Sequence, residues 1–173
     1  MKQIFKLKFS FTLISHSLKS IFYRYHSDKI NIIKQLMPRP KVVIDVGAHA
    51  GQVSKMISRA FSKKVKIIAI EPGLYARFIL RLSIFFNRLN NIDVLPFAVS
   101  DEQGFSFLNI PEKRKNSLGF GLSHMSNNHE DFTDRNFKTH YDYVSVTTID
   151  KIVNDLELQL SLIHISEPTR LES

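Results

Sequence analysis

The chain of 173 residues has no cysteine and no long apolar run. Without cysteine, it can form neither a disulfide framework nor a thiolate-based metal site. No apolar stretch reaches the roughly 18 residues that a membrane-spanning helix needs. The N-terminus mixes lysine with apolar residues, and it lacks the apolar core and the small-residue cleavage site of a signal peptide. These absences lead us to expect a cytoplasmic protein.

Acidic residues are nearly absent from the first part of the chain. Of the 24 basic and 16 acidic residues, nine basic residues and only Asp28 among the acids fall within residues 1–41, so the remainder holds fifteen of each. The net charge of +8 therefore belongs to the N-terminal segment, and the rest of the chain is neutral. A basic footprint across the whole fold is missing, and we predict that nucleic acid is not a partner.

Residues 1–40 have the pattern of a basic amphipathic helical segment. Apolar residues recur at alternating spacings of three and four, which is typical of a helix with one apolar face: Ile4, Leu7, Phe11, Ile14, Leu18, Ile21 and Tyr25. A second short helix would be capped by Ser27 or Asp28 and stopped by Pro38 and Pro40. Two interpretations stay open. The helices pack on the domain or on a partner subunit, or residues 1–25 lie on an anionic membrane surface.

The most informative motif begins with a β-branched run, Val42 to Val46, which is followed by a turn containing Gly47 and Gly51. An amphipathic segment starts directly afterwards. This pattern predicts a buried strand, a tight turn and a helix N-terminus, an arrangement that holds nucleotide-like ligands against open backbone. A second strand, Val65 to Ile70, leads into Glu71, which is placed to accept hydrogen bonds from ribose hydroxyls.

The details of the turn favour one kind of nucleotide ligand. A dinucleotide site normally shows G-x-G-x-x-G, but here His49 stands where a second close-packed glycine would lie. Asp45 precedes the turn, and its charge would repel a pyrophosphate. A ligand with a cationic centre and an ammonium group would suit it better.

Three motifs together resemble a known family. Asp45-Val-Gly-Ala-His-Ala-Gly51, then Glu71-Pro72, then Ala98-Val-Ser-Asp-Glu-Gln-Gly104 are similar to the motifs of FkbM-family S-adenosylmethionine-dependent methyltransferases. The resemblance implies O-methylation of a hydroxyl on a sugar, glycolipid or natural product, with S-adenosyl-L-methionine as cofactor. It also implies a cofactor-binding set: Asp45, Gly47, Ala48, His49, Gly51, Glu71, Ser100 and Asp101. Ser100 or Asp101 would meet the adenine ring. No catalytic residue and no metal site is predicted.

The order of strand-like and helix-like segments from residue 41 predicts an α/β fold. Strand, helix, strand, helix and strand alternate up to about Val99, as expected for parallel strands joined by right-handed crossovers. With the resemblance, this implies an incomplete Rossmann-like class I methyltransferase fold over residues 41–159. Pro96 suggests an edge position or a bulge in the third strand. Two more strands, 105–110 and 141–149, flank a long polar loop, and Thr148 or Asp150 caps a last helix at 151–158.

The C-terminal residues 160–173 are predicted to be non-native. Residues 160–170 match the in-frame translation of a DNA string that looks like a transposase-end adapter used in sequencing libraries, so we expect the native sequence to stop near Gln159. The family continues into a strand carrying K-x-D-x-E-G, which is missing here. We therefore expect a sheet with an unfinished edge and a chain that folds poorly and is inactive.

Two other functions remain open on the sequence. The chain could be a fragment of a nicotinamide-dinucleotide-binding oxidoreductase, although Asp45 and the missing G-x-G-x-x-G speak against it. It could also be a non-catalytic module whose N-terminal helices bind a membrane or a partner.

The adapter interpretation predicts the outcome of a new DNA read. An independent clone, prepared without transposase fragmentation, should differ from this sequence directly after the codon for Gln159 and should encode the K-x-D-x-E-G strand. The same Leu-Ser-Leu-Ile-His codons in that clone would contradict the prediction.

Overall fold

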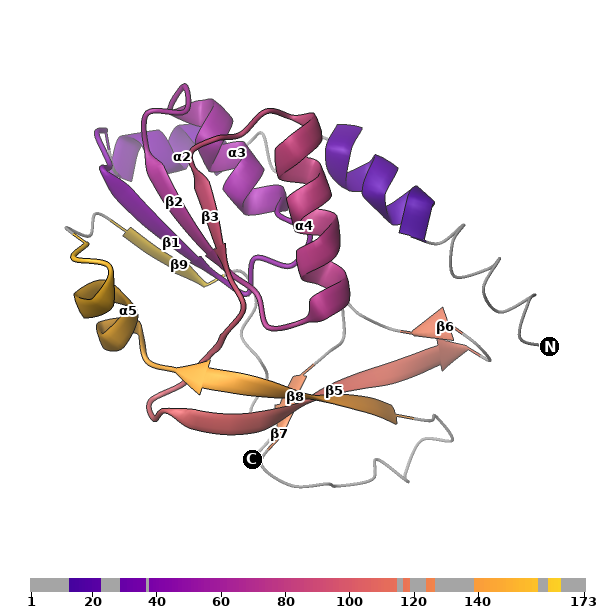
Figure 1. Ribbon diagram of the computed structural model, residues 1–173. Coiled ribbons are helices and arrows are strands. Elements are labelled where there is room, and N and C mark those ends of the chain that lie inside the picture. The colour runs from indigo at the N-terminus through magenta and orange to yellow at the C-terminus, as the bar shows by residue number, and fades with distance from the viewer. Residues whose placement is uncertain are drawn as a thin grey trace.

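Parallel strands and helices alternate along the first half of the domain, as Figure 1 shows for the computed structural model. The elements are β1 (Val42–Val46), α3 (Gln52–Ala60), β2 (Lys66–Ile70), α4 (Leu74–Phe86) and β3 (Ile92–Leu95). The strand pairs β1–β2 and β2–β3 are both parallel. The predicted Rossmann-like α/β fold is confirmed, and β1 and β2 match the predicted strands Val42–Val46 and Val65–Ile70 to within one residue.

The structure describes residues 13–22, 29–36, 38–114, 117–118, 124–126, 139–158 and 162–165. Before β1 it contains a helix at residues 13–22 and α2 (Lys29–Leu36). The predicted stripe positions before residue 13, and Tyr25, lie outside these ranges. None of the described helices is long and apolar enough to cross a membrane.

The core of the sheet follows from the alternation of side chains along a strand. Val43 and Ile67 point to one face, where they pack with residues of α3 and α4 such as Ile57 and Leu80. Ile44 and its neighbours occupy the opposite face, where Ile152 of α5 (Ile149–Asp155) covers them. Helices therefore cover both faces, which explains why β1 and β2 are almost continuously apolar. The Thr148 hydroxyl caps α5 by accepting a hydrogen bond from the Lys151 N–H at 3.1 Å. Of the two predicted capping residues, Thr148 and Asp150, the structure has Thr148.

A second sheet begins where Pro96 ends β3. The chain resumes as β4 (Ala98–Val99), which pairs with β8 (Thr139–Thr147), while β5 (Gly104–Arg114) pairs with β8, β6 (Ser117–Leu118) and β7 (His124–Ser126). The expected edge position is confirmed, since β3 is an outer strand of the first sheet. The single strand expected up to Val99 is wrong, because Pro96 divides it between two sheets. The predicted long loop also contains strands, since the β5–β8 ladder extends to Pro111 and Thr139.

A fourth strand occupies the edge that was expected to be unfinished. β9 (Leu162–Ile165) runs parallel to β1, so the order of the first sheet is β3-β2-β1-β9. The physical reason is that the outer edge of β1 offers unpaired N–H and C=O groups, which an apolar, β-branched segment can satisfy. The expectation that this sheet edge stays open is therefore wrong. Whether residues 160–173 are native stays a prediction.

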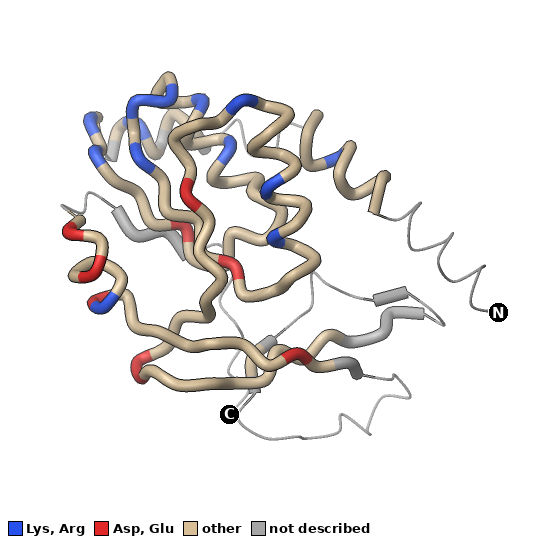
Figure 2. The backbone as a smooth tube through the Cα atoms, viewed as in Figure 1, with Lys and Arg blue, Asp and Glu red and all other residues tan. Residues whose placement is uncertain are grey.

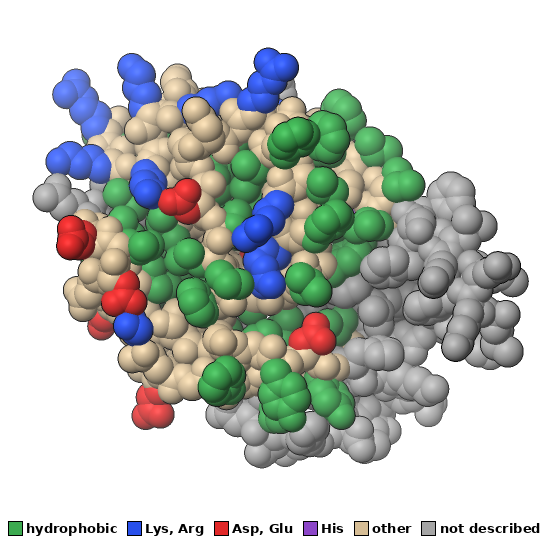
Figure 3. Space-filling model, viewed as in Figure 1, with side chains coloured by type: hydrophobic (Ala, Val, Ile, Leu, Met, Phe, Trp, Pro, Cys, Tyr) green, Lys and Arg blue, Asp and Glu red, His purple; other side chains and the backbone are tan. Residues whose placement is uncertain are grey.

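The helix at residues 13–22 packs on the domain through polar side chains instead of its apolar stripe. Ser17 and Ser20 are buried, and the Ser20 hydroxyl donates to the Ala50 carbonyl at 2.7 Å. The Lys55 ammonium donates to the carbonyl oxygens of Ser20 and Ile21. Ile14 and Leu18, which the periodicity placed on the apolar face, are exposed, and so is Phe22. Figure 3 shows hydrophobic side chains gathered on this side of the molecule.

Charge is distributed unevenly over the fold (Figure 2). Basic side chains gather around the N-terminal ends of β1 and β2 and the C-terminal ends of α3 and α4, where Lys41, Arg59, Lys63, Lys64, Lys66 and Arg88 lie. Acidic side chains gather on α5 and on the turn between β4 and β5. The basic and acidic side chains of this neutral domain therefore lie mostly in different regions.

Lys55 is predicted to hold the helix at residues 13–22 in place. Its side chain is buried, and its ammonium satisfies carbonyl oxygens that would otherwise be unpaired at the end of this helix. Lys55→Met should therefore raise amide hydrogen exchange of residues 13–22 by about tenfold, the loss of one charge-assisted hydrogen bond. Lys64→Met, at an exposed position, is the matched control. Equal exchange in the two variants would contradict this role.

Lys55→Met should also change how the stability of the fold depends on pH. Burial, with the Arg59 charge, lowers the pKa of Lys55 from 10.5 to about 8. Between these values the unfolded chain holds a proton that the folded chain has lost, so this group makes the fold more stable as pH rises. Lys55→Met should lack that gain in urea denaturation between pH 8 and 10.5.

Candidate functional site

The candidate site is built where β1 and β2 end at the same edge of the sheet. The parallel register pairs Val46 with Ile70, so the turn after β1 meets the loop after β2. The N–H groups of Gly47 and Ala48 both donate to the Ile70 carbonyl, at 2.9 and 3.0 Å. The turn is thereby fixed to the end of β2, as the strand–turn–helix prediction requires.

The carboxylate of Glu71 joins the two loops. One oxygen accepts the His49 N–H at 2.8 Å, and the other accepts the Gly73 N–H at 2.8 Å. Glu71 is 8% exposed, and this burial raises the pKa of its carboxyl group. The two backbone N–H groups and the Arg77 charge oppose the increase, and the Asp45 charge adds to it. Each carboxylate oxygen keeps a second acceptor position, so Glu71 can also receive ligand hydroxyls.

Two glycines of the turn have different surroundings. Gly47 has φ +71°, and a Cβ atom added to it would meet nothing within 4 Å, so this part of the turn is open. Gly51 has φ +82°, and an added Cβ would lie 2.3 Å from Leu80 Cδ1 on α4. Gly47 thus leaves space for a ligand to approach the backbone, whereas Gly51 is required for packing between the turn and α4.

Asp45 is fully buried beneath the turn. Its carboxylate accepts the Ser54 hydroxyl at 2.5 Å, which links β1 to α3. Its charge acts on Glu71, as the pKa of that residue indicates. Asp45 on β1 and Glu71 directly after β2 place two acidic groups beside one cationic group, Arg77, at this end of the sheet, and this balance favours a cationic ligand over an anionic one.

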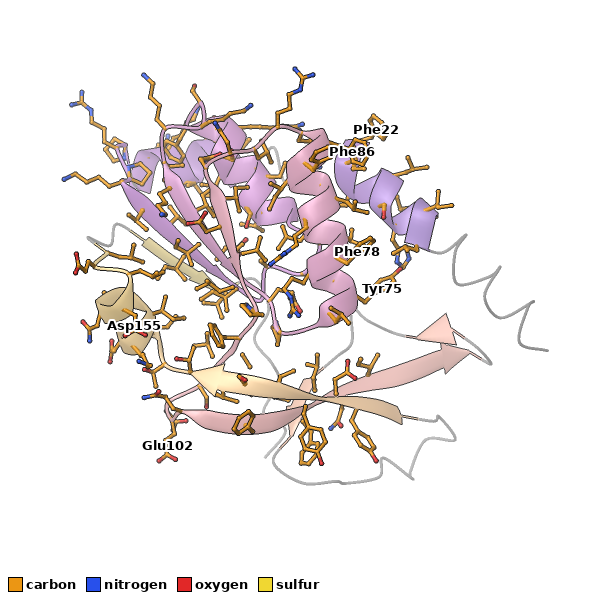
Figure 4. The ribbon with its side chains drawn as sticks, in the orientation of Figure 1. Phe22, Tyr75, Phe78, Phe86, Glu102 and Asp155 are labelled. Atoms are coloured by element: carbon orange, nitrogen blue, oxygen red, sulfur yellow. The ribbon has the colours of Figure 1, made fainter. Side chains whose placement is uncertain are left out.

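Ser100 and Asp101 lie on a different element from the other predicted site residues. They follow β4, where the Ser100 N–H donates to the Thr147 carbonyl at 3.1 Å and the Ser100 hydroxyl donates to Asp101 at 2.8 Å. Asp101 is exposed, and the Ser100 hydrogen bond lowers the pKa of its carboxyl group. Figure 4 labels one neighbour of each group: Glu102, next to Asp101, and Tyr75, in the first turn of α4 after Glu71. These two neighbours lie far apart. Hydrogen bonds therefore connect the turn at residues 47–51 with the loop at Ile70 and Glu71, Asp45 lies beneath this turn, and Ser100 and Asp101 bond to other elements.

Sequence reasoning missed the residues that support the site. The Arg77 guanidinium donates to the carbonyl oxygens of Glu71 and Pro72, at 2.9 and 2.7 Å, and so fixes the loop after β2. Ser54 holds Asp45, as described above. The sequence contains only a weak signal for Ser54, which with Ser58 is a small polar residue at helical spacing among the buried residues of α3. Among the residues that the structure describes, no group of His, Asp and Glu could hold a metal ion.

Comparison with known proteins identifies a family. Residues 45–165 match the family model for the Methyltransferase FkbM domain, which is well over half of the chain. The chain matches no curated protein sequence. Two similar solved structures are a candidate O-methyltransferase from Klebsiella pneumoniae and the plantazolicin methyltransferase BpumL in complex with SAH.

Both structural similarities are limited in extent. The Klebsiella protein shares 8% identity over 49% of this chain and 40% of its own, with a TM-score of 0.38. BpumL shares 15% identity over 55% of this chain and 44% of its own, with a TM-score of 0.30. The matched region therefore spans less than half of either solved chain.

The geometry of the turn predicts that Gly51 cannot be replaced. Gly51→Ala places Cβ against Leu80 at a positive φ, and it should lower the free energy of unfolding by about 2–4 kcal/mol. Gly104→Ala is the matched control, because an added Cβ at Gly104 meets nothing within 4 Å and should change it by less than about 0.5 kcal/mol. Urea denaturation measures both variants, and equal losses would refute the assignment.

Proposed function

The chain belongs to the FkbM methyltransferase family, and we propose that it uses S-adenosyl-L-methionine to methylate a hydroxyl oxygen. The acceptor we propose is a small molecule or glycan: a sugar, a glycolipid or a natural product. The observation that carries the proposal is the Glu71 carboxylate, which is buried at the end of β2 beside an open glycine turn.

The proposed cofactor residues divide by role. Glu71 would bind the ribose hydroxyls, and the open turn at Gly47, Ala48 and His49 would lie against the cofactor. Asp45 would act through the turn, which its buried contact with Ser54 supports, and its charge would favour the methionine ammonium. Gly51 would set the position of the turn. Ser100 and Asp101 remain proposed contacts of the adenine ring, with no support from the hydrogen bonds described above.

Bound in this site, the cofactor would supply a methyl group on a sulfonium. That methyl group would be transferred to the acceptor oxygen, with the C–S bonding pair retained by sulfur and the hydroxyl proton passing to solvent. The residues of this chain would contribute position: orienting two reactants correctly accounts for about 7–11 kcal/mol of a barrier. The negative site would also favour a cationic sulfonium over the pyrophosphate of a nicotinamide dinucleotide.

The location of the protein in the cell and its contact with the membrane form a further part of the proposal. We propose a cytoplasmic protein with peripheral membrane contact through residues 1–25. The neutral charge of the domain supports an acceptor other than nucleic acid.

Glu71→Gln separates binding of the cofactor from folding. The amide keeps the shape of the side chain but has one acceptor oxygen instead of two, so the affinity for S-adenosylmethionine should fall by about 10- to 100-fold. The free energy of unfolding should fall by about 1–3 kcal/mol, because the amide NH2 leaves one of the two backbone N–H groups without an acceptor, while the loss of a buried charge whose pKa is raised offsets part of this cost. Calorimetry with the 173-residue chain measures the affinity, and Glu102→Gln, in the turn between β4 and β5, is the matched control.

The other functions give different results in that experiment. Binding of a nicotinamide dinucleotide in preference to S-adenosylmethionine would favour an oxidoreductase. Absence of binding by either cofactor, in a chain that circular dichroism shows to be folded, would favour a non-catalytic module. Either result would overturn the proposed function.

A further inference from the structure

An exposed apolar surface extends over the helix at residues 13–22 and the outer face of α4. Its members are exposed on both helices: Ile14, Leu18, Phe22, Phe78, Phe85 and Phe86. The side chain of Asn87, which ends α4, donates to the Ile21 carbonyl at 3.3 Å, so Phe22 lies beside the end of α4. Figure 4 shows Phe22 and Phe86 close together there, with Phe78 further along α4. We call the end formed by Phe22, Phe85 and Phe86 the aromatic tip.

The phenylalanine side chains of the aromatic tip are unusually exposed to solvent for large apolar residues. Phe22 is 75% exposed and Phe85 is 74% exposed, and Figure 3 shows apolar side chains gathered over both helices. The cause is the polar packing described above: Ser17, Ser20 and Lys55 attach the helix to the domain, so its apolar side chains remain outside. Apolar patches of this kind mark surfaces that contact another apolar phase.

Basic residues surround the aromatic tip. The Arg59 guanidinium donates to the Asn87 side chain, and the Lys63 ammonium donates to the Arg88 carbonyl at 2.8 Å, so the end of α3 lies against the end of α4. Beside them a shallow hollow is lined by Lys63, Lys64 and Lys66, and by Asp93, which forms an ion pair with Lys66 at 3.0 Å. The basic residues at this end of the domain are Arg59, Lys63, Lys64 and Arg88, whereas Lys55 is buried and Arg77 contacts the loop after β2 at the other end of α4.

We propose that the aromatic tip and the basic residues around it form a docking surface for an anionic lipid membrane. Aromatic and aliphatic side chains enter the boundary between headgroups and acyl chains, while lysine and arginine attract anionic headgroups. A second copy of this chain would bring two positive surfaces together, which opposes self-association through this face. A phosphate backbone would match the charge but would leave Ile14 and Leu18 in water.

This surface differs from a contact through residues 1–25 alone, because α3 and α4 supply most of it. It also leaves the candidate site uncovered: the tip is at the C-terminal end of α4, and Glu71 precedes the N-terminal end. The inference therefore does not depend on the proposed methyl transfer.

Vesicle co-sedimentation of the 173-residue chain tests the surface. The chain should bind vesicles of phosphatidylcholine and phosphatidylserine at about 7:3, and bind pure phosphatidylcholine about tenfold more weakly. The double variant Phe85→Ser/Phe86→Ser should lose about tenfold or more of the binding to the mixed vesicles. Lys64→Glu/Arg88→Glu should lose a similar amount, and added salt should weaken binding of the unmodified chain.

Phe105→Ser is the matched control, because Phe105 is 81% exposed on the second sheet and its loss should leave vesicle binding unchanged. Circular dichroism confirms that each variant is folded. Unchanged binding by Phe85→Ser/Phe86→Ser would overturn the proposal and would assign any vesicle contact to residues outside the tip. A dimer in ultracentrifugation that this variant abolishes, with no vesicle binding by the unmodified chain, would assign the surface to a second copy instead.

Discussion

The candidate site depends on one buried carboxylate. Glu71 accepts N–H groups from His49 and Gly73, so a single side chain fixes the turn after β1 and the loop after β2. Burial alone would make this charge unfavourable, and the two N–H groups and Arg77 offset part of the cost. Each Glu71 oxygen already accepts one backbone N–H, which holds the carboxylate in place. The second acceptor position of each oxygen can therefore receive a ligand hydroxyl.

The negative character of the site explains which ligand it favours. Asp45 lies on β1, beside β2, whose end precedes Glu71, and the Ser54 hydroxyl donates a hydrogen bond to it. A ligand with positive charge relieves the repulsion between these two acids, whereas a pyrophosphate increases it. This physical preference is compatible with the proposed cofactor, whose sulfonium and ammonium groups are cationic.

The local pattern of the sequence predicted most of the central fold. The β-branched runs of β1 and β2 and the glycine turn between them fix strands, turn and helix through short-range preferences, and the structure confirms them. Glu71 was predicted for the same reason, because it directly follows a recognisable strand. Arg77 and Ser54 were missed, since their contacts arise only when α4 and α3 fold back on the strands.

Long-range pairing could not be predicted in the same way. Periodicity identified an apolar stripe on the first helix but not which face it buries, and Ser17 and Ser20 proved to be the buried residues. Pro96 indicated an interruption, yet nothing local showed that the chain would continue in another sheet as β4. The pairing of β9 with β1 likewise depends on an open sheet edge, which no local pattern reports.

The most direct test of the central claim is a crystal structure of the chain with bound S-adenosylmethionine. The account predicts the ribose hydroxyls within about 3.2 Å of the Glu71 carboxylate oxygens, with the open side of Gly47 against the cofactor. A cofactor bound elsewhere, with Glu71 contacting only His49 and Gly73, would contradict it.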